Sequence, residues 1–520
     1  MAGAAQSHAV PGFRRNMVTI CAMTATIMQA LDTTIANVAL PYMQGSLSAS
    51  QDQINWVLTS YIVAAAIMTA PVGWIANRFG RKRIFIICSA GFTIASVMCG
   101  LAQDITQMVV FRLLQGVFGA ALVPLSQAVM LDSYALHERA KAMSIWGMGV
   151  MMGPIMGPSL GAWLTETYSW HWVFFVNLPF GAITVLGLAM FMDETDKNQD
   201  LKFDWFGFAA LAVGIGAMQL ALDRGEQLDW FNSPEIIIES IVSVVGFYYF
   251  FAHSFTTERP FIQFAIFKDR NFVGGVVFMT VMGLVLFSTM ALSSPFLQNV
   301  EGYPIMTAGL LLASRGCGTF VAMMIVGRIM RYIEARTLIA TGLSLTCASL
   351  YVMTGWTDQT SVSSVVVTSI IQGFGFGLVF VPLSTVAFMT LPGHLRTDGT
   401  AMLTLVRNVA SSVGISVVIA KLSSGTTTAH AILSEHINPF NNALQMPNVT
   451  GMIDLSTTTG KAMMDAIVTM QAQIIAFSHD YAMVMFLTAA AVPMAIIIGS
   501  TKAALRKQSE APADHAAVME

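Results

Sequence analysis

The sequence predicts an all-α polytopic membrane protein with two pseudo-symmetric six-helix bundles plus two inserted helices, fourteen transmembrane helices in all. Composition, the spacing of apolar runs and an internal repeat support this fold class. Of the 520 residues, 55% are hydrophobic and 11% are charged, whereas soluble proteins carry roughly 25% charged residues. The mean hydropathy is +0.66. We therefore expect the lipid bilayer to surround most of the chain.

Apolar windows of membrane length follow one another along the chain, separated by charged residues and by Gly or Pro breaks. A bilayer-spanning helix needs about 20 such residues. The first window is longer than the apolar core of a signal peptide, about 7 to 15 residues, so an uncleaved first span is predicted. The predicted spans cover residues 17–41, 54–75, 84–102, 106–131, 142–164, 171–192, 205–222, 235–254, 271–292, 305–327, 337–356, 362–388, 400–420 and 480–501.

These spans divide the chain into four parts. The largest connection between spans, 421–479, is rich in Ser, Thr and Asn and is expected to form a large periplasmic loop. Within it, Ala462 to Phe477 is predicted to form a short apolar helical stretch. The four predicted parts are an N-terminal six-helix bundle at 1–200, two inserted transmembrane helices at 201–262, a C-terminal six-helix bundle at 263–502 and a cytoplasmic tail at 503–520.

The basic residues favour one orientation of the spans. If the N-terminus is cytoplasmic, 20 of the 26 Lys and Arg residues fall on the cytoplasmic side. Membrane proteins keep an excess of positive charge in their cytoplasmic loops. Because an even number of spans returns the chain to the same side, both termini are expected to be cytoplasmic.

An internal repeat links the two predicted bundles. The segment Val123 to Ser126 recurs as Val381 to Ser384, and flanking residues recur with it at a spacing of 257 to 259 residues. Biased apolar composition alone is the alternative explanation, but a chance match would not keep its register over a whole span. Duplicated halves are typical of secondary transporters, which move two bundles around a site near the bilayer midplane.

Four segments carry recognisable motifs. They are Leu31 to Pro41 at the end of span one, Gly73 to Lys82 between spans two and three, Arg112 to Gly116 in span four, and Gly153 to Pro158 in span five. Together they resemble the major facilitator superfamily, and within it the fourteen-span drug:proton antiporters of the EmrB/QacA type. The second segment is general to the superfamily, whereas the first and fourth mark exporters. The resemblance covers nearly the whole chain and is to exporters of the bacterial cytoplasmic (inner) membrane.

The resemblance implies a secondary active exporter of hydrophobic or amphipathic small molecules, of the multidrug type, driven by proton antiport through alternating access. Its implied partners are protons, those substrates, the bilayer and, in Gram-negative cells, a periplasmic adaptor (membrane fusion) protein leading to an outer-membrane channel. A proton-coupled importer of the same fold is the alternative. No enzyme activity, cofactor, metal or nucleic-acid partner is expected, since the nine histidines are scattered and the five cysteines lack metal-ligand spacing.

Asp32 and Arg112 are the candidate proton-coupling residues. Asp32 lies about 14 Å from the outer end of its span and Arg112 about 9 Å from the outer end of span four, at 1.5 Å per residue. The two charges are therefore predicted at comparable depth and are expected to share one cavity. Charges inside a membrane are costly and are functional by default. A purely structural ion pair that locks spans one and four is the alternative.

Span five carries a stripe of glycines at every fourth position, against which another helix can pack closely. Its two prolines remove backbone donors and bend the helix. The resemblance implies a helix that slides or seals during alternating access, and tight packing alone is the simpler interpretation. The residues of this antiporter helix motif are Gly149, Gly153, Pro154, Gly157, Pro158 and Gly161.

The loop between spans two and three is the predicted cytoplasmic gate. Its basic residues set topology, and the resemblance adds a role in bracing the gate. The family usually has Asp where this chain has Asn77, so a hydrogen bond is expected there in place of a charge interaction. The gate-loop residues are Gly73, Asn77, Arg78, Gly80, Arg81 and Lys82.

Two further charges lie inside predicted spans. Arg407 is about 10 Å from the cytoplasmic end of its span and is expected to reach that interface with its long side chain. Arg315 is near the middle of its span and must face protein or water.

Overall fold

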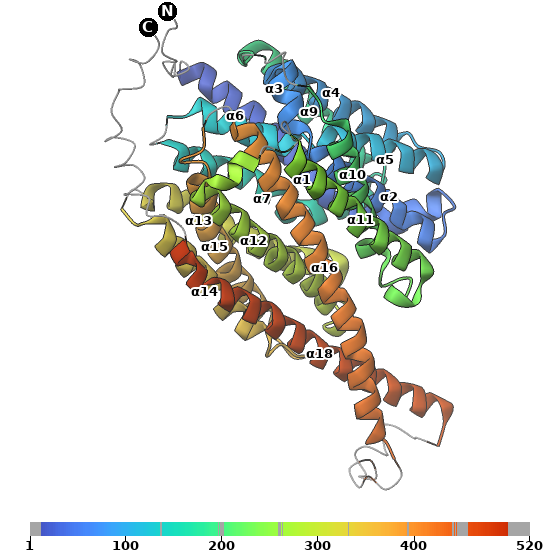
Figure 1. The fold of residues 1–520 in the computed structure, drawn as a ribbon. Helices are drawn as coiled ribbons and strands as arrows, with labels where there is room; N and C mark the ends of the chain where they lie inside the picture. The colour runs from blue at the N-terminus through green and yellow to red at the C-terminus, as the bar shows by residue number, and fades with distance from the viewer. Residues whose placement is uncertain are drawn as a thin grey trace, which may run out of the picture.

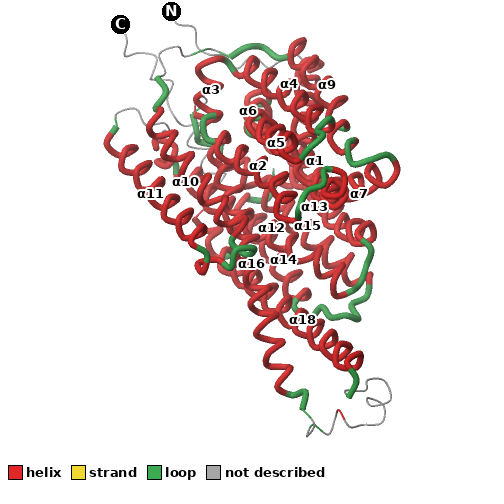
Figure 2. The backbone as a smooth tube through the Cα atoms, turned by 90° about the vertical axis from the view of Figure 1, so that its right-hand side faces the viewer, coloured by secondary structure: helices red, strands yellow, loops and turns green. Residues whose placement is uncertain are grey.

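The computed structural model describes residues 12–497 apart from a few short segments. The segments left out are 136–137, 196, 198–201, 258–261, 263, 331, 393–394, 439–440, 442–443 and 445–455. The predicted tail at 503–520 lies outside the described residues. Within the described part of the chain the regular elements are helices and no strand occurs (Figure 2).

The first nine α-helices build the N-terminal half. They pack mainly on one another, with α1 against α7 and α9, and α5 against α2 and α4. They are α1 (Gly12–Ser46), α2 (Gln51–Thr69), α3 (Val72–Phe79), α4 (Arg81–Gly100), α5 (Ile105–Gly119), α6 (Leu122–Ser133), α7 (Arg139–Thr167), α8 (Trp172–Phe175) and α9 (Asn177–Phe191).

The C-terminal half follows two inserted helices. Its helices pack on each other as α12 against α16, α13 against α15, and α18 against α14 and α16. The inserted pair is α10 (Trp205–Arg224) and α11 (Pro234–Thr256), joined through η2 (Trp230–Asn232) and followed by η3 (Phe264–Lys268). The C-terminal half comprises α12 (Arg270–Pro295), η4 (Phe296–Val300), α13 (Ile305–Ile329), α14 (Ala335–Met353), α15 (Val362–Ala387), α16 (Arg396–Glu435), α18 (Thr458–Ala491) and η7 (Pro493–Ile497).

Each predicted span corresponds to one helix or to one interrupted helix. Twelve described helices are long and apolar enough to cross a bilayer, and the pair α2 and α3, bent by 56°, would make a thirteenth if it is one broken span. α7 has 29 residues, which is also sufficient length. The interruptions coincide with prolines: α3 begins after Pro71, and α6 begins just before Pro124. Proline lacks the backbone N–H that would continue the helix ladder.

The connection at 421–479 differs from the predicted loop. α16 has 40 residues and continues to Glu435, and α18 begins at Thr458. The predicted start of the last span is therefore wrong, because α18 begins well before residue 480. The helix ends at Ala491, just before Pro493. The polar Ser and Thr residues of this region suggested a loop, but residues 421–435 contain no proline and include good helix formers such as Ala, Leu, Lys and Glu.

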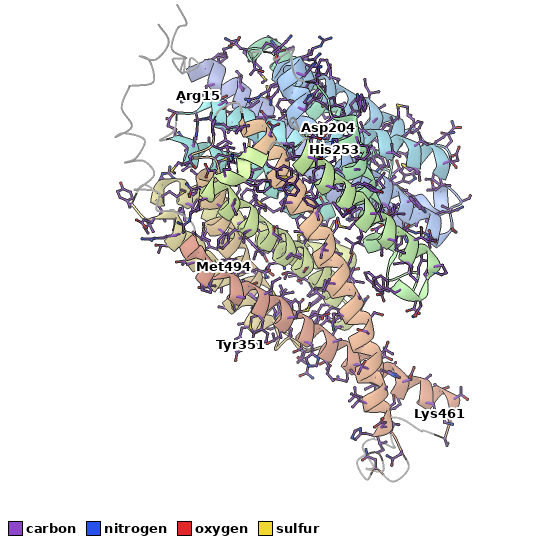
Figure 3. All side chains as sticks on the ribbon, viewed as in Figure 1. Arg15, Asp204, His253, Tyr351, Lys461 and Met494 are labelled. Carbon is purple, nitrogen blue, oxygen red and sulfur yellow. The ribbon has the colours of Figure 1, made fainter. Side chains whose placement is uncertain are left out.

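The ends of α16 and α18 pack together as a hairpin that projects from the bundle (Figure 1). At 1.5 Å per residue, α16 is about 60 Å long, roughly twice the hydrocarbon thickness of a bilayer. Figure 3 places Lys461 on the projecting hairpin and Arg15 at the opposite end of the molecule. We call the end that carries the α3–α4 and α6–α7 turns the basic face, and the other end the hairpin face.

The two halves meet mainly along α7 and α13. The contact uses small residues: Gly316 of α13 lies against Ile155, and Gly309 lies against Pro158. At the basic face, α16 also contacts α3 and α6 of the N-terminal half.

The inserted helices are attached to both halves. Asp223 of α10 accepts a hydrogen bond from Thr59 of α2, and Gln219 donates to Ser412 of α16 over 2.8 Å. A side-chain contact at the basic face joins the two inserted helices to each other. His253 Nε2 of α11 lies 2.9 Å from Oδ1 of Asp204, the residue before α10 (Figure 3). α10 therefore bridges the two halves along one side of the molecule.

Candidate functional site

Asp32 and Arg112 form an ion pair in the interior of the N-terminal half. Arg112 Nη1 donates to Asp32 Oδ2 over 2.7 Å. Asp32 has no exposed surface, and Arg112 is 1% exposed. α1 and α5 supply the two residues, so the expected sharing of one site by residues eighty positions apart is present in the fold.

Amides complete the coordination of the Asp32 carboxylate. Gln115 Nε2 donates to Oδ1 over 2.7 Å, and Asn177 Nδ2 of α9 donates to the same oxygen over 3.0 Å. Asn177 Nδ2 also donates to Ser96 Oγ over 2.9 Å. A buried charge is tolerated when hydrogen bonds replace water around it. Three donors from three groups do so here.

The guanidinium of Arg112 has further partners besides Asp32. Its Nε donates to the carbonyl oxygen of Val57 over 3.0 Å, and its Nη1 donates to Gln115 Oε1 over 2.8 Å. The Tyr61 ring lies beneath it, with the guanidinium carbon 4.3 Å from the ring centroid. Four helices, α1, α2, α5 and α9, thus converge on one charge pair.

Sequence reasoning missed most of this network. Gln115 belongs to the quoted Arg112 to Gly116 motif, and its spacing of three residues from Arg112 places both on one helix face. Gln115 could therefore have been identified from the sequence as a neighbour of Arg112. Asn177 and Ser96 are single polar residues in apolar helices, and their meeting with Asp32 depends on tertiary packing.

The glycine stripe of α7 packs on α1, next to Asp32. A Cβ on Gly153 would overlap the Ala30 carbonyl group, and one on Gly157 would overlap Thr34 Oγ1. Thr34 Oγ1 donates to the Gly153 carbonyl oxygen over 3.0 Å. Gly149 lies against Met23 and Gly161 against Ile35 in the same way. The close approach expected from the glycine spacing is therefore present, and it occurs within one half.

The antiporter helix motif also contains two prolines, Pro154 and Pro158. Pro158 lies beside Gly309 of α13 and so takes part in the contact between halves. Pro154 lies within α7, and its side chain is outside the described set. α7 therefore has one face on the helix that carries Asp32 and another on the opposite half.

An acidic residue not identified from the sequence joins the halves at the basic face. Asp132, at the end of α6, pairs with Arg81 and accepts a 2.6 Å hydrogen bond from Arg396 Nη1 of α16. Arg139 Nη1 also donates across the interface, to the Phe388 carbonyl oxygen over 3.4 Å. These contacts join the two halves at the basic face. The signal available in the sequence was an acidic residue directly after span four, next to a basic loop.

The remaining gate-loop residues lie close to the same junction. A Cβ on Gly73 would overlap Asp398 of α16, so this position requires glycine. Gly80 has φ 96°, which glycine adopts without strain. Lys82 Nζ donates to the Ala189 carbonyl oxygen over 2.9 Å. Asn77 and Arg78 are half-buried on α3, one turn beyond Gly73.

Comparison with known proteins agrees with this architecture. The family model described as Major Facilitator Superfamily matches residues 22–415. The multidrug export protein EmrB of Escherichia coli (strain K12) is 33% identical over 453 residues, covering 86% of this chain and 87% of the relative. The chain belongs to the major facilitator superfamily. The resemblance to its EmrB-type multidrug transporters is thereby confirmed.

Two further comparisons show the breadth of the similarity. The fatty acid resistance protein FarB of Neisseria gonorrhoeae is 34% identical over 428 residues, covering 82% of this chain and 84% of the relative. The structure of the proton:xylose symporter XylE shares the fold, with a TM-score of 0.57 and 13% identity, covering 94% of this chain and 97% of the symporter.

In this member of the superfamily the other intramembrane arginines lie in the C-terminal half. Arg315 Nη2 donates to Ser293 Oγ over 3.2 Å, so it faces protein as expected. Arg407 Nη2 lies 3.4 Å from the neighbouring Asn408 Oδ1, and its Nε is buried without a described partner. Its reach to the cytoplasmic interface stays a prediction. The packing of α16 on α12 at Gly283, against the Arg407 carbonyl group, holds this turn inside the bundle.

A cavity of about 400 Å³ lies between the inserted helices and the C-terminal half. Its volume is within the roughly 300–1,000 Å³ common for small-molecule sites. The lining is apolar apart from Thr280, whose hydroxyl donates to the Val276 carbonyl oxygen over 2.9 Å. The lining residues are Leu211, Ile215, Phe247, Phe250, Phe251, Ile262, Phe264, Phe267, Thr280, Leu284, Met402, Leu405, Val406, Val409, Ala410 and Val413.

Proposed function

We propose that this protein exports hydrophobic or amphipathic small molecules from the cytoplasm in exchange for protons, through alternating access. The observation that carries the proposal is the buried Asp32–Arg112 pair, a titratable carboxylate in the core of a transporter fold. Its relatives include proteins named for multidrug export and for fatty acid resistance. The apolar cavity beside α10 and α11 fits substrates of the same character.

Proton exchange at Asp32 would change the contacts of α1. Protonation removes the negative charge that attracts Arg112, while the Gln115 and Asn177 amides can remain hydrogen-bonded to the carboxyl group. α1 packs closely on α7, and α7 packs on α13 of the other half. A shift of α1 therefore reaches the interface between the halves through directly packed helices. A structural ion pair remains the alternative role for Asp32 and Arg112.

We place the basic face in the cytoplasm, with both termini, and the hairpin face in the periplasm. The protein would then lie in the bacterial inner membrane, with Asp132 and Arg396 closing the cytoplasmic side. The projecting α16–α18 hairpin would be available to a periplasmic adaptor protein that leads to an outer-membrane channel.

Flux measurements in inside-out membrane vesicles test the proposal. A proton gradient with an acidic lumen should drive accumulation of a fluorescent hydrophobic cation or acid, with release of lumenal protons. Collapse of the gradient by an uncoupler should stop accumulation. Movement of substrate out of the lumen together with protons would instead identify the proton-coupled importer of the same fold.

A further inference from the structure

The apolar cavity beside the inserted helices borders a surface that faces the bilayer. α10 and α11 line one side of it, and α12 and α16 line the other (Figure 1). α11 is largely exposed, with 22% of its apolar window buried inside the protein. Phe251 of this helix lines the cavity and is 47% exposed. The surrounding lipid chains are therefore the nearest apolar molecules.

The cavity runs from the basic face to the middle of the spans. Phe264 and Phe267 of η3 line it just before α12 begins at Arg270. Thr280 and Leu284 of α12 line its inner end, about 15 and 21 Å from Arg270 at 1.5 Å per residue. The hydrocarbon core of a bilayer is about 30 Å thick, so one leaflet accounts for about 15 Å. The cavity therefore reaches at least as deep as a single acyl chain does in its leaflet.

η3 has three distinct sides at the basic-face end of the cavity. Residues three apart share a side in a 3₁₀-helix. Phe264 and Phe267 line the cavity, whereas Ile266 is buried in the core. Ala265 and Lys268 form the third side and are exposed. An apolar wall of the cavity and a cationic side chain are thus adjacent residues of one short helix.

Two cations flank this end of the cavity. Lys268 and Arg270 are exposed, and among the described residues neither side chain has an ion-pair or hydrogen-bond partner. The acidic residue between them, Asp269, is already engaged. Its Oδ1 accepts from two backbone N–H groups at the start of α12, and its Oδ2 accepts from the Thr390 hydroxyl. The segment therefore presents net positive charge beside an apolar cavity.

The lining gives an occupant apolar contact and little orientation. The hydroxyl of Thr280, its polar lining group, donates to its own helix. An unfilled apolar void loses the contacts that its lining would otherwise make, so a chain from the bilayer is stabilised inside it. Selectivity must then come from the charges at the basic face. Basic pockets between membrane helices bind anionic lipid headgroups.

We propose that the cavity holds one acyl chain of an anionic phospholipid, whose phosphate lies against Lys268 and Arg270. This lipid ties the inserted helices to α12 and α16 of the C-terminal half through contacts that the protein alone does not make. The inference goes beyond the proposed export function and does not depend on it, because lipid binding is measured without substrate or transport. A hydrophobic substrate that enters the same cavity would have to displace the chain.

Thermal unfolding of the purified, delipidated full-length protein in detergent tests the headgroup contact. Added phosphatidylglycerol should raise the Tm of the wild-type protein at lower concentration than phosphatidylcholine with the same chains. Lys268→Gln/Arg270→Gln should weaken the apparent affinity for phosphatidylglycerol about ten-fold, as expected for two basic residues at a charged headgroup, and leave that for phosphatidylcholine unchanged. Arg83→Gln/Arg328→Gln removes the same charge from exposed positions of the basic face and is the matched control.

Leu284→Trp tests the placement of the acyl chain. The larger side chain fills the inner end of the cavity, so phosphatidylglycerol and phosphatidylcholine should both lose affinity several-fold. Because cavity filling commonly stabilises a protein, the Tm without added lipid should equal or exceed that of wild type, which reports correct folding. Ala348→Trp, in the separate groove between α14 and α18, should bind both lipids as wild type does.

Three results would each overturn the inference. Equal phosphatidylglycerol affinity in wild type and Lys268→Gln/Arg270→Gln would exclude the headgroup contact, and unchanged affinity in a stable Leu284→Trp would exclude the chain from the cavity. Equal stabilisation by inorganic phosphate would show a site for a free anion instead of a lipid. If Leu284→Trp is unstable, the double variant still decides, because its two positions are exposed.

Discussion

Arg396 of the C-terminal half donates a 2.6 Å hydrogen bond to Asp132 of the N-terminal half, and Arg81 pairs with the same carboxylate. One acidic side chain thus holds an arginine from each bundle at the basic face. Because Asp132 contacts both halves, the stability of the closed basic face depends on its charge.

Asp132→Asn should open the basic face more often. Partly exposed ion pairs contribute about 1 kcal/mol, so the closed population should fall roughly five-fold relative to the open one. Spin labels at Phe79 and Tyr332, both exposed at the basic face, would report the change as a broader and longer distance distribution. The labels require a background in which the five native cysteines are replaced.

The matched control for Asp132 is Glu138→Gln. Glu138 pairs with Arg15 over 2.9 Å at the same face, but both residues belong to the N-terminal half. Its loss should leave the distance distribution unchanged. If the two variants gave the same distribution, the bridge through Asp132 would not control the gate.

Asp32→Asn should abolish pH-driven transport while leaving substrate binding intact. The amide preserves the shape of the side chain and cannot exchange the proton. Reconstituted transport under an imposed pH gradient and binding of a fluorescent substrate measure the two properties separately. Asp193→Asn, at an exposed pair with Arg14, is the control that should transport normally. Normal gradient-driven efflux by Asp32→Asn would leave only the structural role for the pair.

Much of this fold was predictable because membrane spans are encoded by local composition. The depth of Asp32 and Arg112 also followed from helical rise alone, and the structure brings them together. Asn177 and Ser96 could not be identified in this way, because their role depends on which helices become neighbours. One sequence does not specify that packing.

The helical stretch predicted at Ala462 to Phe477 is confirmed, since it lies within α18. The extent of the hairpin was mispredicted for a different physical reason. Apolarity identifies the part of a helix suited to the bilayer, but α16 and α18 extend beyond their apolar stretches, and polar helices are equally stable in water when they pack on a partner. Buried Met464 and Val468 supply that packing on α18. The side-chain contacts, and not the overall polarity, decide that residues 421–435 are helical.

Gly153→Ala should destabilise the protein and reduce transport. A Cβ at this position would overlap the Ala30 backbone, two residues before Asp32, so α1 must move away from α7. Overpacking of this kind costs about 1–3 kcal/mol. Thermal inactivation in detergent and proton-driven flux would both reveal it. In Gly309→Ala the new methyl would be 3.5 Å from Pro158, an ordinary contact, so this variant should behave as wild type.

Asn77→Asp should weaken, not strengthen, the contact between α3 and α16. Gly73 lies against Asp398, and Asn77 is one turn further along the same helix face, so a second carboxylate would face the first. The Phe79–Tyr332 label distance should lengthen in Asn77→Asp and return towards wild type in the double variant Asn77→Asp/Asp398→Asn. Additive effects in this double-mutant cycle would show that the two positions do not interact.

The α16–α18 hairpin exposes an apolar face where it projects from the bundle. Met463 and Ile467 of α18 are 48% and 40% exposed, and Ile432 of α16 is also exposed. Ile474, nearer the bundle in the apolar stretch predicted at Ala462 to Phe477, is instead buried. That stretch is therefore divided: its inner part packs on the transporter, and its outer part is open to a partner.

If the proposed periplasmic adaptor docks on this face, the double variant Met463→Ser/Ile467→Ser should lose it without losing transport. Because both side chains are exposed, their replacement leaves the core unchanged, so pH-driven flux in liposomes should match wild type. Co-purification with the periplasmic adaptor and resistance of whole cells should fall several-fold if this face docks the adaptor. Tyr332→Ser, an exposed apolar residue on the basic face, is the control that should retain both. Full adaptor yield with the double variant would mean that the hairpin serves only to pack and extend the last helices.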